Sequence, residues 1–147
     1  MNKKVIVAGL VASIAMAMVE MMYEGLFGAG FWSAPIFIAA TILRDLQAVA
    51  IPVSFNLMAV VLGMMGHMMN SVILALVFVA ALGSFLTSRI TGVVVGALYA
   101  LAVFFVMWFA VLPFIDPVIL HLNPVVFALS HMLWGAVIGF MVAKKAA

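Results

Sequence analysis

Four long apolar segments constrain this chain more than any other feature of its sequence. They cover residues 5–26, 55–85, 90–112 and 124–143. A helix that crosses the hydrocarbon core of a bilayer needs about 20 mostly apolar residues. Because only helices and closed barrels satisfy their backbone hydrogen bonds inside lipid, segments of this length predict transmembrane helices. The sequence therefore predicts an all-α membrane protein, with residues 1–147 forming a single domain that is a bundle of four transmembrane helices.

A fifth apolar stretch, residues 31–43, is too short to cross a bilayer. It contains Pro35, which the first turn of a helix tolerates, and Ser33, a residue type that often caps a helix. We therefore expect a short interfacial or re-entrant helix of about residues 33–46 between spans one and two. The prolines lie in the connections or at the first residue of a predicted span, and none interrupts the interior of a span, which supports the predicted boundaries.

The few charged residues indicate the orientation. Charged residues make up 7% of the chain and hydrophobic residues 70%, which excludes a soluble globular domain. Basic residues gather near both termini and in the short connection between spans two and three: Lys3, Lys4, Arg89, Lys144 and Lys145. Since basic residues favour the cytoplasmic side, we expect a bacterial inner-membrane protein with both termini in the cytoplasm. Its expected surroundings are the lipid bilayer, with no nucleic-acid partner.

The two halves of the chain share a faint pattern. Aligning His67 with His131 places Gly66 on Ser130. Two parallel helix-pair repeats, related by an axis along the membrane normal, are one interpretation, and chance similarity is the other. In the repeat, spans two and four present His67 and His131 at the same depth across the bundle.

Glu20 and Glu24 are the most unusual residues in the predicted spans. They lie one turn apart on one face of the first span. A charged side chain deep in a bilayer costs from about 2.5 to more than 10 kcal/mol, so Glu20 must face the bundle, carry a proton or have a partner. The expected partners include His67 and His131. For Glu24, near the outer interface, a solvated carboxylate is the alternative.

Glutamate and histidine side chains inside a helix bundle are a typical ligand set for a metal or a haem. We predict that His67 and His131 bind the cofactor, with Glu20 and Glu24 as further metal ligands. The cofactor is haem b or a transition metal, namely iron, copper or zinc. The residues expected around this site are Asn70, Tyr99, Trp134, Met64 and Met68. The alternative is that these polar residues serve only helix packing and interhelical hydrogen bonds.

Three short motifs carry a resemblance. They are Gly66-His-Met-Met-Asn in span two, residues 92–99 at the start of span three, and Ser130-His-Met-Leu-Trp-Gly in span four. With them the chain resembles small uncharacterised four-span bacterial inner-membrane proteins, some of which are labelled sodium:proline symporter. Spans two to four are also distantly similar to the YagU-type inner-membrane family. The resemblance implies a four-span fold and no catalytic residues.

Three functions are compatible with these features. The chain contains no nucleotide-binding loop, hydrolase elbow or zinc-protease helix, so we expect no enzyme. The first function is a non-enzymatic module that binds a metal or haem. The second is an accessory or assembly subunit of a larger membrane complex, in which the glutamates and histidines are structural hydrogen-bond pairs. The third is a small proton-coupled transporter that acts as a homo-oligomer, with Glu20 as its protonatable group.

Overall fold

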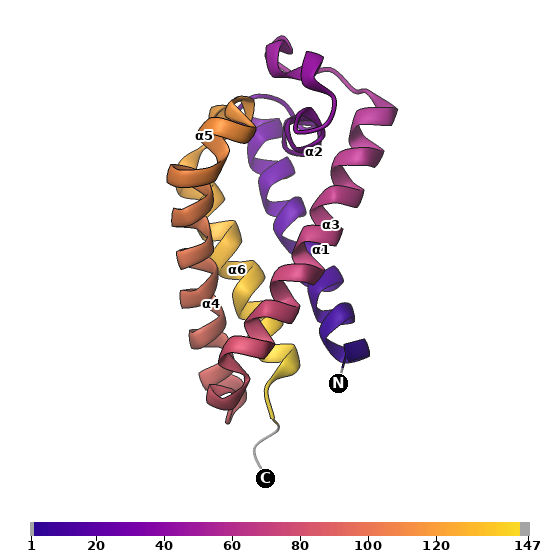
Figure 1. Ribbon diagram of the computed structural model, residues 1–147. Coiled ribbons are helices and arrows are strands. Elements are labelled where there is room, and N and C mark those ends of the chain that lie inside the picture. The colour runs from indigo at the N-terminus through magenta and orange to yellow at the C-terminus, as the bar shows by residue number, and fades with distance from the viewer. Residues whose placement is uncertain (1, 145–147) are drawn as a thin grey trace.

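The computed structural model describes residues 2–144, which form a bundle of helices (Figure 1). The α-helices are α1 (Asn2–Phe27), α2 (Ser33–Ala40), α3 (Leu57–Leu82), α4 (Arg89–Val106), α5 (Leu112–Ile115) and α6 (Pro124–Val142). The 3-10 turns are η1 (Arg44–Ala48), η2 (Gly83–Phe85) and η4 (Pro117–His121), and η3 (Met107–Val111) is a π-helical turn. Residues 2–144 contain no β-strand, which confirms the predicted all-helical class.

Four helical segments are long and apolar enough to cross a membrane. They are Lys3–Phe27, Leu57–Phe85, Arg89–Ile115 and Pro124–Val142. Each begins and ends within three residues of the corresponding predicted span. Length and hydropathy alone therefore located the four long helices of the bundle.

The third long segment differs from its prediction at one end. It continues past Leu112 to Ile115, so Pro113 lies inside this segment, and the expectation that no proline interrupts a span is wrong here. Proline has no N–H, and its ring clashes with the carbonyl four residues earlier, which is that of Phe109. The π-helical turn η3 contains Phe109 and widens the backbone just before the proline. We attribute the continuation of the helix to this wider turn.

The tightest helix contact joins α4 and α6. A Cβ atom added at Gly96 would clash with the carbonyl oxygen of Gly135, and one added at Gly92 would clash with that of Gly139. A Cβ atom added at Gly135 or Gly139 of α6 would in turn clash with a carbonyl oxygen of α4. Small residues at this four-residue spacing are what permits two helix backbones to touch.

The helices α3 and α4 follow one another in the chain but hardly touch. The short connection of residues 86–88 makes them antiparallel, as predicted, yet α3 packs on α1 and α2 while α4 packs on α6 (Figure 1). A two-fold repeat would pair α3 with α4 in the way that α1 pairs with α6. The two contacts are not equivalent, because α1 packs closely along α6 whereas α3 and α4 hardly touch.

The two ends of the bundle differ in charge. The described ends of the chain lie at the same end of the bundle as the connection from α3 to α4 (Figure 1). The basic residues described at that end are Lys3, Lys4, Arg89 and Lys144, and Lys145 lies outside the described residues. The opposite end carries α2, η1 and η4.

The short helix predicted for residues 33–46 is present as α2 followed by η1. All but one of the residues of α2 are buried. Gly63 of α3 permits this close packing, because a Cβ there would clash with the carbonyl oxygen of Pro35. The expected cap is wrong, since Trp32 occupies the N-cap position and the buried hydroxyl of Ser33 has no hydrogen-bond partner among residues 2–144.

The glycine contact between α4 and α6 gives a first test. Gly96→Ala should destabilise the fold by about 1–3 kcal/mol, because the new methyl group meets a carbonyl oxygen of the facing helix. The matched control is Gly83→Ala, where the nearest atom lies 3.7 Å from the added Cβ, an ordinary contact. Thermal unfolding in detergent, followed by circular dichroism, should show a lower midpoint for the first variant only. Equal midpoints would contradict the contact.

Candidate functional site

A cavity of about 380 Å³ lies inside the bundle. Its walls come from α3 on one side and from α4, η3 and α5 on the other, with α1, α2 and α6 completing the lining. The space exists because α3 and α4 diverge. Two of its lining residues, Met69 and Asn70, are exposed and lie in the middle of α3. The cavity is therefore open at the side of the bundle, about halfway along α3.

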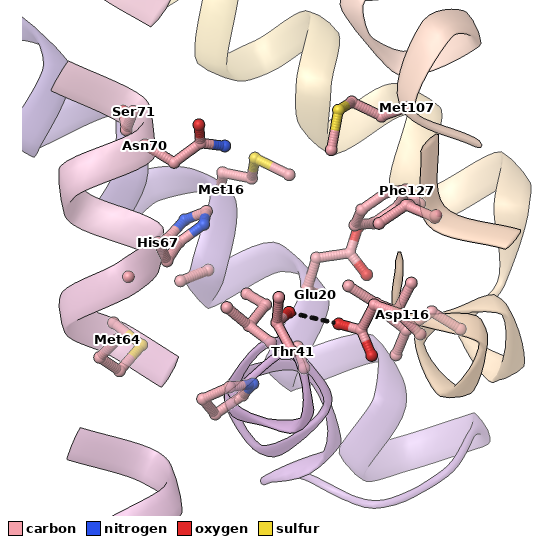
Figure 2. Close-up of a pocket in the computed structure, with 18 of the residues that line it drawn as sticks. Met16, Glu20, Thr41, Met64, His67, Asn70, Ser71, Met107, Asp116 and Phe127 are labelled. Carbon is pink, nitrogen blue, oxygen red and sulfur yellow. Dashed lines mark hydrogen bonds between the residues drawn. The ribbon is translucent and has the colours of Figure 1, made fainter. Parts of the chain in front are cut away.

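Glu20 of α1 lies in the wall of this cavity. Figure 2 shows its side chain between His67 on one side and Phe127 on the other. The residue is 2% exposed. Its Oε1 accepts a hydrogen bond of 2.5 Å from the hydroxyl of Ser130, whereas its Oε2 is buried without a partner among the described residues. Glu20 thus faces the bundle, as the sequence predicts, but its partner is Ser130 rather than a histidine.

The two histidines come from different helices and line the same cavity. Nε2 of His67 lies 3.0 Å from the carbonyl oxygen of Ser13, and Nδ1 of His131 lies 2.7 Å from that of Phe127. Because a carbonyl oxygen only accepts, these nitrogens carry the proton of each neutral ring. The other nitrogen of each ring forms no hydrogen bond with the described residues and offers a lone pair.

A chain of hydrogen bonds joins three helices beside the cavity. Nε1 of Trp134 in α6 donates to the hydroxyl of Ser71 in α3 over 2.6 Å. That hydroxyl donates in turn to the carbonyl oxygen of Gly9 in α1 over 2.7 Å. Trp134 and Ser71 are both buried and both line the cavity, so this chain fixes one of its walls.

Most of the predicted site residues come together in this cavity. Those that line it are Glu20, Met64, His67, Asn70, His131 and Trp134. Tyr99 lies behind the wall, where its hydroxyl donates to the carbonyl oxygen of Leu74 and its ring stacks on Trp134. Met68 is not among the lining residues.

Glu24 does not join the site, and both expectations for it are wrong. It is buried, and its Oε2 accepts the N–H of Ala29 at 2.7 Å while its Oε1 accepts that of Asn123 at 3.1 Å. Gly28 leaves room for this carboxyl group, since a Cβ there would clash with it. Glu24 therefore closes the turn after α1 and holds the start of α6, and is neither a metal ligand nor a solvated carboxylate.

The predicted metal set is not assembled. Within residues 2–144 there is no group of three or more His, Cys, Asp or Glu side chains that could hold a metal ion. The physical reason is that Glu24 accepts the backbone N–H groups of Ala29, after α1, and Asn123, before α6. This leaves Glu20 and two histidines, which lie around a cavity rather than at one point.

Asp116 is a site residue that the sequence did not single out. It is buried at the end of the cavity that lies toward α2, here called the outer end. It accepts hydrogen bonds from Thr41 at 2.9 Å, drawn in Figure 2, and from Gln47 at 2.5 Å. Gln47 also accepts the N–H of Val118. These bonds join the segment after α2 to the segment after α5 across the outer end of the cavity. Burial raises the pKa of Asp116 above its ordinary value, opposed by its hydrogen bonds and by Arg44.

No protein family, curated protein or solved structure matches this chain. The chemistry of the cavity is therefore the basis for assigning a function. Its largely apolar walls carry the carboxyl groups of Glu20 and Asp116 and two imidazole lone pairs, a set that is suited to binding a ligand.

The buried carboxyl of Asp116 predicts a specific pH dependence. Because its pKa is raised, the folded protein holds this proton more tightly than the unfolded chain does. The stability that Asp116 contributes is therefore full below a pH of about 4 and is lost as the pH rises through the raised pKa. Relative to Asp116→Asn, the wild-type unfolding midpoint should be higher at a pH of about 4 than at a pH of about 8. A constant difference between the two proteins would show that this carboxyl does not titrate as inferred.

Proposed function

We propose that the chain is a non-enzymatic binding protein of the bacterial inner membrane, with four spans and both termini in the cytoplasm. Its ligand is a small molecule dissolved in the membrane, which binds in the cavity between α3 and α4. One observation carries the proposal: an open apolar cavity contains Glu20, His67 and His131, each with a hydrogen-bonding atom that has no partner among the described residues. Ligand sites are typically apolar clefts with a few polar groups of this kind.

The outer surface of the bundle supports the membrane environment. Large apolar side chains are exposed along all four long helices, for example Ile14, Met65, Phe105 and Leu129. A soluble monomer does not expose apolar surface on this scale. The basic residues gather at the end that holds the described ends of the chain, which by the positive-inside rule favours a cytoplasmic position for that end.

The position of the opening supports a ligand that arrives from the lipid. Asn70 and Met69 mark the rim in the middle of α3, at a depth that corresponds to the hydrocarbon core. At the outer end, the hydrogen bonds of Asp116 join the two connections that border the cavity. A molecule dissolved in the membrane therefore reaches the side opening without crossing the polar outer end.

Trp134 provides a direct test of the side opening. In the Trp32→Phe, Trp108→Phe background it is the remaining tryptophan, and it lines the cavity. In vesicles of phosphatidylcholine brominated in mid-chain, acyl chains that enter the cavity should quench its fluorescence. Gly66→Phe adds a ring at a lining position where an added Cβ has room, and should reduce the quenching.

The matched control for this test is Gly83→Phe, which adds the same ring away from the cavity. It should leave the quenching of Trp134 unchanged. Equal quenching in the Gly66→Phe variant and its parent would mean that lipid chains do not enter between α3 and α4, and the proposed function would fail.

Haem b is a second candidate ligand, and the histidine hydrogen bonds favour it. Metal-bound histidines usually donate their other ring N–H to a backbone carbonyl or carboxylate, as His67 and His131 each do here. The absence of a three-residue metal group within residues 2–144 argues against a bare ion. A haem needs only axial ligands from the protein, because the macrocycle supplies the other four.

Absorption spectroscopy separates this candidate from an organic ligand. If haem is bound, protein purified from haem-supplemented cells should show a stoichiometric Soret band that His67→Ala and His131→Ala each remove or shift. Met68→Leu, at a position of the same helix outside the cavity lining, should keep the band. Purified wild-type protein without a Soret band would exclude the haem candidate.

A further inference from the structure

Three groups that line the cavity, Glu20, His67 and His131, each present a hydrogen-bond acceptor that has no donor among the described residues. The proton of each imidazole is used on a backbone carbonyl, so Nδ1 of His67 and Nε2 of His131 present lone pairs. Glu20 has one oxygen, Oε2, without any donor in the described structure. A ligand that matches these groups must bring hydrogen-bond donors.

Within residues 2–144, Glu20 also has no positively charged partner. Among the described residues, the basic side chains of Lys3, Lys4, Arg89 and Lys144 lie at the opposite end of the bundle from α2. Arg44, at the outer end, donates to the carbonyl oxygen of Ile115 over 2.6 Å. A buried carboxylate without a positive partner is strongly unfavourable in an apolar environment. A ligand with a positive charge would remove this cost.

The remaining walls suit the other parts of such a ligand. Phe127 and Trp134 line the cavity, and aromatic faces attract cations. The thioethers of Met16 and Met107 and neighbouring aliphatic side chains give the rest of the lining an apolar character. An alkyl chain can lie along these side chains and leave the cavity between α3 and α4.

We propose that the ligand is a single-chain amphiphile with a primary ammonium headgroup. This inference rests on the proposed function, since it requires a cavity that opens to the membrane. The ammonium group donates a hydrogen bond to Oε2 of Glu20, and the imidazole lone pairs of His67 and His131 are further acceptors that line the same cavity. Its charge neutralises the Glu20 carboxylate, while Ser130 keeps its hydrogen bond to the other carboxylate oxygen. The alkyl chain lies between α3 and α4.

Four probes with the same twelve-carbon chain separate the parts of this proposal. Dodecylammonium has both the charge and the donors, and dodecyltrimethylammonium has the charge without donors. Dodecanol has a donor without charge, and dodecyl sulfate has the opposite charge. Each probe is added to the brominated vesicles that contain the Trp134 variant. A probe that occupies the cavity displaces acyl chains and restores the fluorescence of Trp134.

Dodecylammonium should restore the fluorescence at a membrane mole fraction roughly tenfold lower than dodecanol requires, because hydrogen bonds to charged groups are the stronger ones. Dodecyltrimethylammonium should fall between them, and dodecyl sulfate should be the weakest. Glu20→Gln should bring dodecylammonium and dodecanol to within about threefold of each other. Asp45→Asn removes an exposed acid from the outer connection and should leave the order unchanged, which separates cavity binding from attraction to surface charge.

Several results would overturn the inference. They are equal potency of dodecanol and dodecylammonium, a preference for dodecyl sulfate, or an ammonium preference that survives Glu20→Gln. Failure of all four probes to restore a fluorescence that brominated lipid does quench would also overturn it, although the side opening would stand. Absence of any cavity-dependent quenching would instead reject the proposed function on which it rests.

Discussion

The backbone contact between α4 and α6 is the constraint on which the rest of the structure depends. Helices in lipid gain no hydrophobic free energy from association, so close packing decides which pairs form. The two backbones touch at Gly92 and Gly96 of α4 and at Gly135 and Gly139 of α6, so α4 packs against α6. In a similar way, Gly63 lets α3 pack closely on α2, and Gly9 lets α1 pack closely on α3. Since α3 and α4 are held by different partners, they diverge, and the cavity is the space left between them.

The hydrogen bonds inside the bundle explain why Glu20 stands apart. Side chains that are hydrogen-bond donors, such as Ser71, Tyr99 and His67, donate to backbone carbonyl oxygens of a neighbouring helix. A carbonyl has two lone pairs and can accept a second bond without loss of the helix. A carboxyl group needs donors instead, and free backbone N–H groups occur only at helix starts and in turns. Glu24 reaches two of them beside the end of α1, whereas Glu20, one turn earlier, reaches only the hydroxyl of Ser130 among residues 2–144.

The sequence predicts the long helices well because each depends on local hydropathy. The same holds for the small-residue stripes, since a four-residue glycine spacing is visible without a structure. The sequence does not predict which helices pack against one another. A short connection between spans two and three predicts antiparallel helices, but it does not reveal that other contacts hold them apart.

In the candidate site, too, some residues can be predicted from the sequence and others depend on the fold. Glu20, His67 and His131 are conspicuous in the sequence because polar residues are rare in apolar spans, and all three line the cavity. The different role of Glu24 depends on a turn that brings the N–H of Ala29 back to it, and on Asn123 from a distant part of the chain. Asp116 lies in a connection, where an acidic residue is ordinary, so its burial against Thr41 and Gln47 has no sequence signal.

The contacts of the two histidines bear on the apparent repeat. His67 is held by the carbonyl of Ser13 on another helix, whereas His131 is held by the carbonyl of Phe127 one turn earlier in its own helix. Residues related by a two-fold axis would have equivalent contacts, and these do not. The two rings line one cavity because α3 and α6 both pack on α1, which carries Glu20 between them. The convergence of the polar groups therefore follows from the central position of α1 and needs no symmetry between the two halves.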